Sequence, residues 1–328
     1  MRTWLIGALA SVLLLPACTQ TPPAPAAAAP PAGAARPIVM GFSQIGAESE
    51  WRTANTNSIR SAAAAAGITL KFSDAQQKQE NQVKALRAFI AQRVDIISFS
   101  PVVETGWETV LREARAAHIP VIITDRAVAV ADDSLYVALI GSDFVEEGRR
   151  VARWLLEHGP PGSAPVRIVE LQGTVGSAPA NDRKRGFQEV IAANPRYRIV
   201  RSQSGDFTRA KGKEVMEAFL KAEGRHIEVL FAHNDDMAIG AIQAIEEAGM
   251  QPGKDILVVS IDGVKGAFEA MIAGKLNLTV ECNPLLGPQL MAAAREVVAG
   301  RPVARRIVVD EGVFPREAAA AALAQRQY

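Results

Sequence analysis

The chain has 328 residues, of which 48% are hydrophobic and 5% aromatic, and its formal net charge is +1. A chain of this length and composition can bury a large core and favours two domains over one. Because it is almost neutral, nothing in its charge suggests a nucleic acid as the partner.

The beginning of the chain resembles the signal peptide of a bacterial lipoprotein. Arg2 precedes an apolar run over residues 4–15, which is too short to span a bilayer but has the length of a signal-peptide core. Residues 15–18, Leu-Pro-Ala-Cys, are similar to a lipobox, in which Cys18 would carry the lipid. An ordinary cleaved signal with an incidental Cys18 is the alternative. Residues 19–36 are rich in alanine and proline, so we expect an extended tether there.

After the tether, short apolar runs alternate with longer segments of helical spacing. The expected strands are 37–42, 68–73, 95–100, 121–124, 136–140, 166–171, 198–202, 229–232, 256–261, 276–281 and 307–309. The expected helices are 51–66, 78–92, 105–118, 143–158, 180–193, 208–222, 237–248, 264–273 and 285–299. This alternation requires parallel strands with helical crossovers. Two such runs in tandem predict an α/β fold of two doubly wound parallel-sheet lobes with a cleft between them.

The strand over residues 121–124 ends in two opposite charges, Asp125 and Arg126. Open α/β sheets bind their ligands at the carboxyl ends of the strands, where these two side chains are expected. A carboxylate that only accepts hydrogen bonds and a guanidinium that only donates them suit a ligand rich in hydroxyl groups, such as a sugar. The alternative is an ion pair that joins neighbouring loops.

Other polar and aromatic side chains also follow strands or open helices. Trp51 can cover the apolar face of a sugar ring, and Arg52 can donate to its hydroxyl groups. Asn234 has the alternative role of a helix N-cap. The remaining candidates are Glu48, Arg183, Phe207 and Asp262. The two carboxylates that follow strands, Asp125 and Asp262, together with three arginines and two aromatic rings, predict one convergent polar site.

Five stretches carry a resemblance to a known family: residues 41–46, 76–81, 169–176, 201–207 and 232–236. Over residues 39–280 the chain resembles the type I periplasmic sugar-binding proteins of ABC transporters, of the ribose and galactose class, and among them the galactofuranose-binding proteins. The resemblance implies a monomeric receptor in the periplasm or on the outer face of the membrane. It would close around a monosaccharide, galactofuranose, and deliver it to an ABC permease.

The resemblance also assigns the site and the lobes. The implied ligand-binding residues are Glu48, Trp51, Arg52, Asp125, Arg126, Arg183, Phe207, Asn234 and Asp262. Lobe one would comprise residues 37–141 plus 264–282, and lobe two residues 142–263 plus 283–328. The three hinge crossings would lie near Gly141, Gly263 and Asn283. Two departures bear on the choice of sugar: Glu50 stands where the similar proteins carry glycine, and Cys282 where ribose binders present an amide.

Three alternatives to a transport receptor are a glycosidase, a transcriptional repressor and a chemosensory receptor. A glycosidase would use Asp125 and Asp262 as its acid pair, but both acids are expected beside arginines, which keep a carboxyl group ionised. The four histidines show no metal-ligand spacing, so we expect no enzyme activity, no cofactor and no metal. A transcriptional repressor would need DNA-binding helices where this chain has an export signal. A chemosensory receptor for a sugar or an autoinducer stays open.

Overall fold

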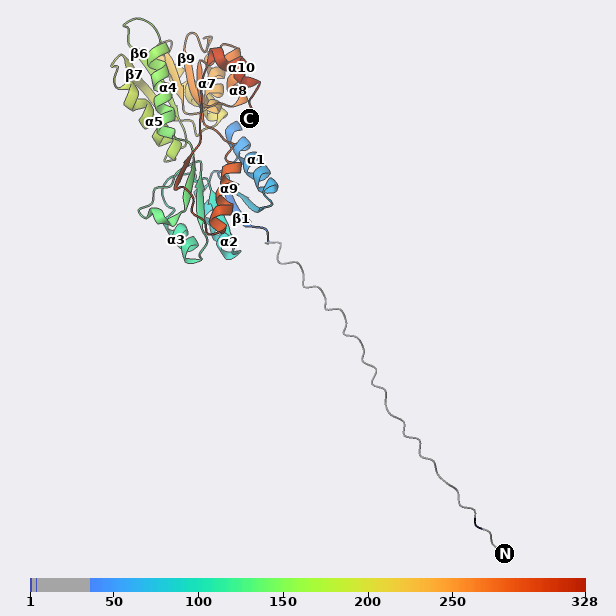
Figure 1. Ribbon diagram of the computed structural model, residues 1–328. Coiled ribbons are helices and arrows are strands. Elements are labelled where there is room, and N and C mark those ends of the chain that lie inside the picture. Colours follow the sequence, from blue (N-terminus) through green and yellow to red (C-terminus); the bar gives the residue numbers. More distant parts are fainter. Residues whose placement is uncertain (2–3, 5–35) are drawn as a thin grey trace. The chain divides into compact units, whose positions relative to one another are not determined.

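The computed structural model describes Met1, Trp4 and residues 36–328, and residues 37–328 form one compact unit, which carries two lobes (Figure 1). Apart from Met1, Trp4 and Arg36, the predicted signal peptide, the lipobox with Cys18 and the tether therefore lie outside the described residues. Within the described part of the chain, no helix has the length and hydrophobicity needed to cross a membrane.

The first lobe is built on a six-stranded parallel sheet with the order β11-β5-β4-β3-β1-β2. Its strands are β1 (Val39–Gln44), β2 (Thr69–Asp74), β3 (Ile96–Phe99), β4 (Val121–Thr124), β5 (Ala138–Gly141) and β11 (Arg306–Val308). Its helices are α1 (Glu50–Ala65), α2 (Gln79–Ala91), α3 (Glu108–Ala116) and α9 (Gly287–Val298).

The second lobe repeats this plan with the strand order β12-β10-β9-β8-β6-β7, in which only β12 runs antiparallel to its neighbour. Its strands are β6 (Val166–Gln172), β7 (Tyr197–Ser204), β8 (Val229–Ala232), β9 (Leu257–Asp262), β10 (Leu278–Glu281) and β12 (Val313–Pro315). Its helices are α4 (Phe144–His158), α5 (Ala178–Ile191), α6 (Arg209–Glu223), α7 (Asp235–Glu247), α8 (Lys265–Ile272) and α10 (Ala319–Leu323). The prediction of two doubly wound lobes is confirmed.

Strand β4 shows why its first three residues are apolar. Val121 and Ile123 face the core formed with α2 and α3, whereas Ile122 faces the core formed with α1 and α9. All three side chains are at most 2% exposed. A parallel strand that is covered on both faces needs apolar residues on each face. This explains the apolar run that precedes Asp125 and Arg126.

The predicted division of the carboxyl-terminal part between the lobes is wrong. Residues 264–282, expected in lobe one, lie in lobe two, because β10 pairs with β9 and α8 packs against α7 and α10. In the opposite sense, α9 packs against α1 and β11 pairs with β5, so residues 287–308 belong to lobe one. The chain therefore passes between the sheets after β5, after β10 and between β11 and β12, and Gly263 is not at a crossing.

Candidate functional site

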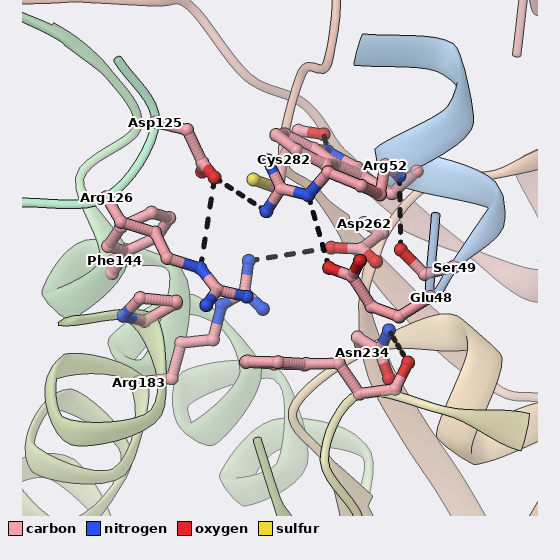
Figure 2. Close-up of a pocket in the computed structure, with 13 residues that line it drawn as sticks. Glu48, Ser49, Arg52, Asp125, Arg126, Phe144, Arg183, Asn234, Asp262 and Cys282 are labelled. Carbon is pink, nitrogen blue, oxygen red and sulfur yellow. Dashed lines mark hydrogen bonds and ion pairs between the residues drawn. The ribbon is translucent and has the colours of Figure 1, made fainter. Parts of the chain in front are cut away.

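A pocket lies between the two lobes at the carboxyl ends of both sheets (Figure 2). The space free of protein atoms within it is about 290 Å³, part of which is open to solvent. The first lobe contributes Glu48, Ser49, Trp51, Arg52, Asp125 and Arg126; the second contributes Phe144, Pro179, Arg183, Phe207, Asn234 and Asp262; Cys282 comes from the crossing after β10. All nine side chains predicted from the sequence line this pocket.

Sharp turns at the ends of strands bring several of these side chains into the pocket. Asp125 follows β4 with a φ of 60°, Phe207 follows β7 with a φ of 62°, and Asp262 ends β9 with a φ of 134°. Residues other than glycine rarely adopt positive φ, and each such position costs about 1–3 kcal/mol that the surrounding structure must offset. Strain of this kind clusters at functional sites, which agrees with a pocket made for a ligand.

In the first lobe, Arg52 of α1 holds the acidic groups of the pocket together. Its Nη2 donates to Oδ2 of Asp125 at 2.8 Å, and its Nε lies 3.2 Å from Oε1 of Glu48. Burial works against the charge of Arg52, but the attraction of Asp125 and Glu48 prevails and raises its pKa. Asp125 also accepts from the Ser100 hydroxyl at 2.8 Å, whereas Nε of its neighbour Arg126 is 3.9 Å away. Asp125 therefore pairs with another element of the fold and does not simply bridge to the next residue.

In the second lobe, Arg183 of α5 has the corresponding role. Its Nε donates to Oε2 of Glu147 at 2.7 Å, and its Nη2 lies 3.5 Å from Oδ1 of Asp262. Gly148 lets α4 approach α5 so closely that a Cβ there would overlap the carbonyl group of Arg183. Burial raises the pKa of Asp262 well above its ordinary value in spite of Arg183.

Aromatic rings and arginines alternate around the pocket. The guanidinium of Arg126 lies 5.1 Å from the ring centre of Phe207, although the two residues belong to different lobes. The ring of Trp51 lies 4.6 Å from the guanidinium of Arg52, and its Nε1 donates to the carbonyl of Cys282 at 2.5 Å. Apolar faces beside charged donors match the two kinds of surface that a sugar ring presents.

Two buried polar atoms of the pocket have no hydrogen-bond partner among the described residues. They are Nε of Arg126, a donor, and Oε2 of Glu48, an acceptor. Burial, with repulsion from Arg52, lowers the pKa of Arg126 to about 10, so the side chain stays charged at neutral pH. Buried polar groups are almost always hydrogen-bonded, so an unpaired donor and acceptor in one pocket point to a ligand that supplies both partners.

Residues 40–302 match the family described as periplasmic binding protein domain. The chain is also 55% identical over 257 residues to the galactofuranose-binding protein YtfQ of Escherichia coli (strain K12), a match that covers 77% of this chain and 80% of that protein. The chain belongs to the periplasmic binding protein family.

Two solved structures are similar over most of the chain. One, from Mycobacterium smegmatis in complex with β-D-fucofuranose, is 54% identical, with a TM-score of 0.87 over 89% of this chain and 95% of that one. The other, from the arabinose ABC transporter of Shewanella sp. ANA-3 bound to α- and β-L-arabinofuranose, is 52% identical. Its TM-score is 0.85, over 88% of this chain and 96% of that one.

Sequence reasoning missed four lining residues of this periplasmic binding protein: Ser49, Phe144, Pro179 and Cys282. Cys282 was noted as a departure but was not assigned to the site. Ser49 is the N-cap of α1 and accepts from the backbone N–H of Arg52 at 3.1 Å, a role that its position before a helix could have indicated. Asn234 combines both predicted roles, because it caps α7 through the N–H of Met237 and also lines the pocket.

Glu50 lies outside the lining of the pocket, at the edge of the cleft. Its carboxylate pairs with Arg209 at 2.9 Å, and its backbone N–H donates to Oδ2 of Asp236 at 2.8 Å. Arg209 also reaches Oδ1 of Asp236 at 2.6 Å. We call these three residues the Glu50 clasp. Because Glu50 belongs to lobe one and both partners belong to lobe two, the clasp joins the lobes across the cleft.

Proposed function

We propose that this chain is the extracytoplasmic receptor of a sugar ABC importer and that it binds one monosaccharide in the furanose form, with galactofuranose as the first candidate. The observation that carries the proposal is the pocket, in which arginines, carboxylates and three aromatic rings from both lobes surround an unpaired donor and an unpaired acceptor. The proteins named above bind galactofuranose, fucofuranose and arabinofuranose, which share a five-membered ring.

The proposed roles follow from the chemistry of each side chain. Asp125, Asp262 and Glu48 accept from sugar hydroxyl groups, Arg52, Arg126 and Arg183 donate to them, and Asn234 can do both. Trp51 and Phe207 cover the apolar faces of the ring. Because these groups come from both lobes, a sugar gains its full set of contacts only when the cleft is closed, which shifts the population towards the closed form. A micromolar Kd for the sugar would correspond to a standard binding free energy of about 8 kcal/mol.

The decisive experiment uses galactose labelled with ¹³C at C1. The anomeric carbon resonates at different shifts in the furanose and pyranose forms, so the spectrum of the complex identifies the bound ring. Calorimetry on the same protein, with ribose, arabinose, glucose and inositol beside galactose, measures selectivity. We expect one saturable site that holds galactofuranose. A bound pyranose would overturn the ring assignment. If none of these sugars binds in a saturable way, the proposal of a sugar receptor is overturned.

The proposal includes three further points that the sequence suggests. The receptor acts without chemical change of its ligand, so incubation with a galactofuranoside should give no turnover. It acts as a monomer that delivers the sugar to a membrane permease. Cys18 carries a lipid anchor, so Cys18→Ser should release the protein from membranes, and continued membrane association would contradict the anchor.

A further inference from the structure

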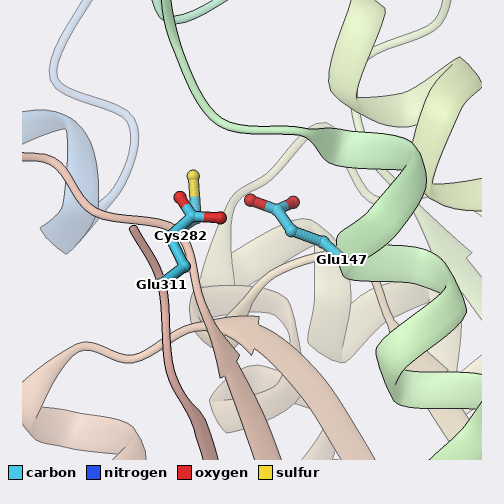
Figure 3. A group of neighbouring side chains, drawn as sticks. All are labelled: Glu147, Cys282 and Glu311. Carbon is cyan, nitrogen blue, oxygen red and sulfur yellow. The ribbon is translucent and has the colours of Figure 1, made fainter. Parts of the chain in front are cut away.

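A second cluster of polar side chains lies on the hinge side of the pocket, where the three crossings of the chain meet. Ser142 follows β5, Cys282 follows β10, and Glu311 lies between β11 and β12. Glu147 points towards them from α4 (Figure 3). One oxygen of each glutamate and Sγ of Cys282 all lie within 4.8 Å of one another. Only Cys282 among these four side chains also lines the pocket.

The carboxylate of Glu147 is incompletely paired in this cluster. Arg183 donates to its Oε2 at 2.7 Å, and the Cys282 thiol faces the carboxylate as a weak donor. Among the described residues no N–H or O–H group donates to Oε1, although the side chain is only 1% exposed. A buried carboxylate oxygen without a donor is costly and requires an explanation. This oxygen lies beside the buried thiol of Cys282 and the carboxylate of Glu311. The three groups together are a set of metal ligands.

We propose that Glu147, Cys282 and Glu311 bind one thiophilic divalent cation, with Zn²⁺ as the cation to test. A thiolate disfavours Mg²⁺ and Ca²⁺, whereas Zn²⁺ accepts mixed sulfur and oxygen ligands in a tetrahedral arrangement. Tetrahedral Zn²⁺ holds sulfur and oxygen ligands about 3.5 Å apart, so these side chains need to draw together by about 1 Å.

Neighbouring groups hold the candidate ligands in place through hydrogen bonds. Oε1 of Glu311 accepts from the backbone N–H of Asn283 at 3.1 Å and from the hydroxyl group of Ser142. The Ser142 oxygen also lies 3.3 Å from Sγ of Cys282, so it or a solvent molecule can complete the coordination. Hydrogen bonds from neighbouring groups normally orient the carboxylates that bind a metal, as Arg183 and Asn283 do here.

A bound ion would join α4 to the second and third crossings, and Ser142 holds the first crossing to the same cluster. The sequence predicts no metal because the three ligands are separated by 135 and 29 positions along the chain (282 minus 147, and 311 minus 282), which matches no local ligand spacing. The proposal does not rest on sugar binding.

The test uses the full chain with Cys18→Ser, in which Cys282 is the only remaining thiol. Calorimetry with Zn²⁺ should show one ion per chain. Co²⁺ in place of Zn²⁺ should produce the thiolate-to-cobalt charge-transfer absorption that reports a sulfur ligand. Cys282→Ala, Glu311→Gln and Glu147→Gln should each weaken Zn²⁺ binding by at least about 10-fold.

The matched control is Glu317→Gln, which removes an exposed carboxylate six positions beyond Glu311 and should leave Zn²⁺ binding unchanged. Thermal unfolding shows which variants are folded. Because Glu147 also pairs with Arg183, Glu147→Gln is the variant most at risk of misfolding. If it does not fold, the Cys282→Ala and Glu311→Gln variants decide the test. No saturable Zn²⁺ binding by the folded parent, or full binding by folded Cys282→Ala and Glu311→Gln variants, would overturn the proposal.

Discussion

The Glu50 clasp predicts that a charge outside the pocket controls how tightly the sugar is held. Glu50→Gln removes the charge of the carboxylate while it keeps the length of the side chain. The contact with Arg209 joins side chains that are 35% and 48% exposed, and such pairs contribute about 0.2–1 kcal/mol. Because the contact joins the two lobes, this free energy is lost only from the closed form, and the Kd for the sugar should rise about 1.5- to 5-fold.

The increase should appear in the dissociation rate, because the clasp forms after the sugar has entered and holds the cleft closed. Arg209→Gln should raise the Kd by a similar factor, because it removes the same contact between the lobes. Its pair with Asp236 lies within lobe two and is lost from the open and the closed form alike. High salt should reduce the difference between parent and Glu50→Gln, because both side chains are partly in solvent.

A matched control is available within one lobe. Arg87 and Glu113 pair at 2.8 Å with side-chain exposures of 53% and 36%, close to those of the clasp, but both residues belong to lobe one. Glu113→Gln should therefore change the sugar affinity by no measurable amount. Stopped-flow and calorimetry at low salt decide the matter: an unchanged dissociation rate in Glu50→Gln, or an equal effect in Glu113→Gln, would refute the reasoning.

Four further predictions concern the pocket and the hinge. Asp262→Ala should weaken sugar binding by at least about 2 kcal/mol, since it unpairs buried donors; near-parent affinity in calorimetry would remove Asp262 from the site. Gly173→Ala would drive a Cβ into the ring of Phe207, so the Kd should rise about 3- to 10-fold, and an unchanged Kd would mean that the ring does not contact the sugar. In metal-free protein, burial and then repulsion from Glu147 raise the pKa of Glu311 from 4.5 to about 9. The folded form therefore keeps a proton that the unfolded form loses, so the unfolding free energy, measured by urea titration, should fall as pH rises from about 5 to about 9. Glu311→Gln should flatten that dependence, and an equally steep fall in the variant would assign it to other groups. Saturating Zn²⁺ should lower the Kd for the sugar, and the sugar should lower the Kd for Zn²⁺ by the same factor; equal sugar affinities with and without Zn²⁺ would contradict the coupling.

The sequence alone determined the class of fold and nine of the thirteen residues that line the pocket. Continuous apolar runs such as 121–124 can only be strands covered on both faces, and helical segments between them force parallel pairing. Parallel strands bring their carboxyl ends to one edge of a sheet, so polar residues that follow strands, such as Asp125 and Asn234, converge although they are far apart in sequence.

The tertiary structure alone decided which sheet the last strands join, how the lobes touch and what meets at the hinge. An apolar strand such as β10 fits equally well into either sheet, and only its pairing with β9 places it in lobe two. Glu50 can join the lobes only because Arg209 of the other lobe lies beside it. Glu147 lies beside Cys282 and Glu311 because three crossings converge. These contacts depend on the relative positions of distant segments, and periodicity and local spacing carry no information about such positions.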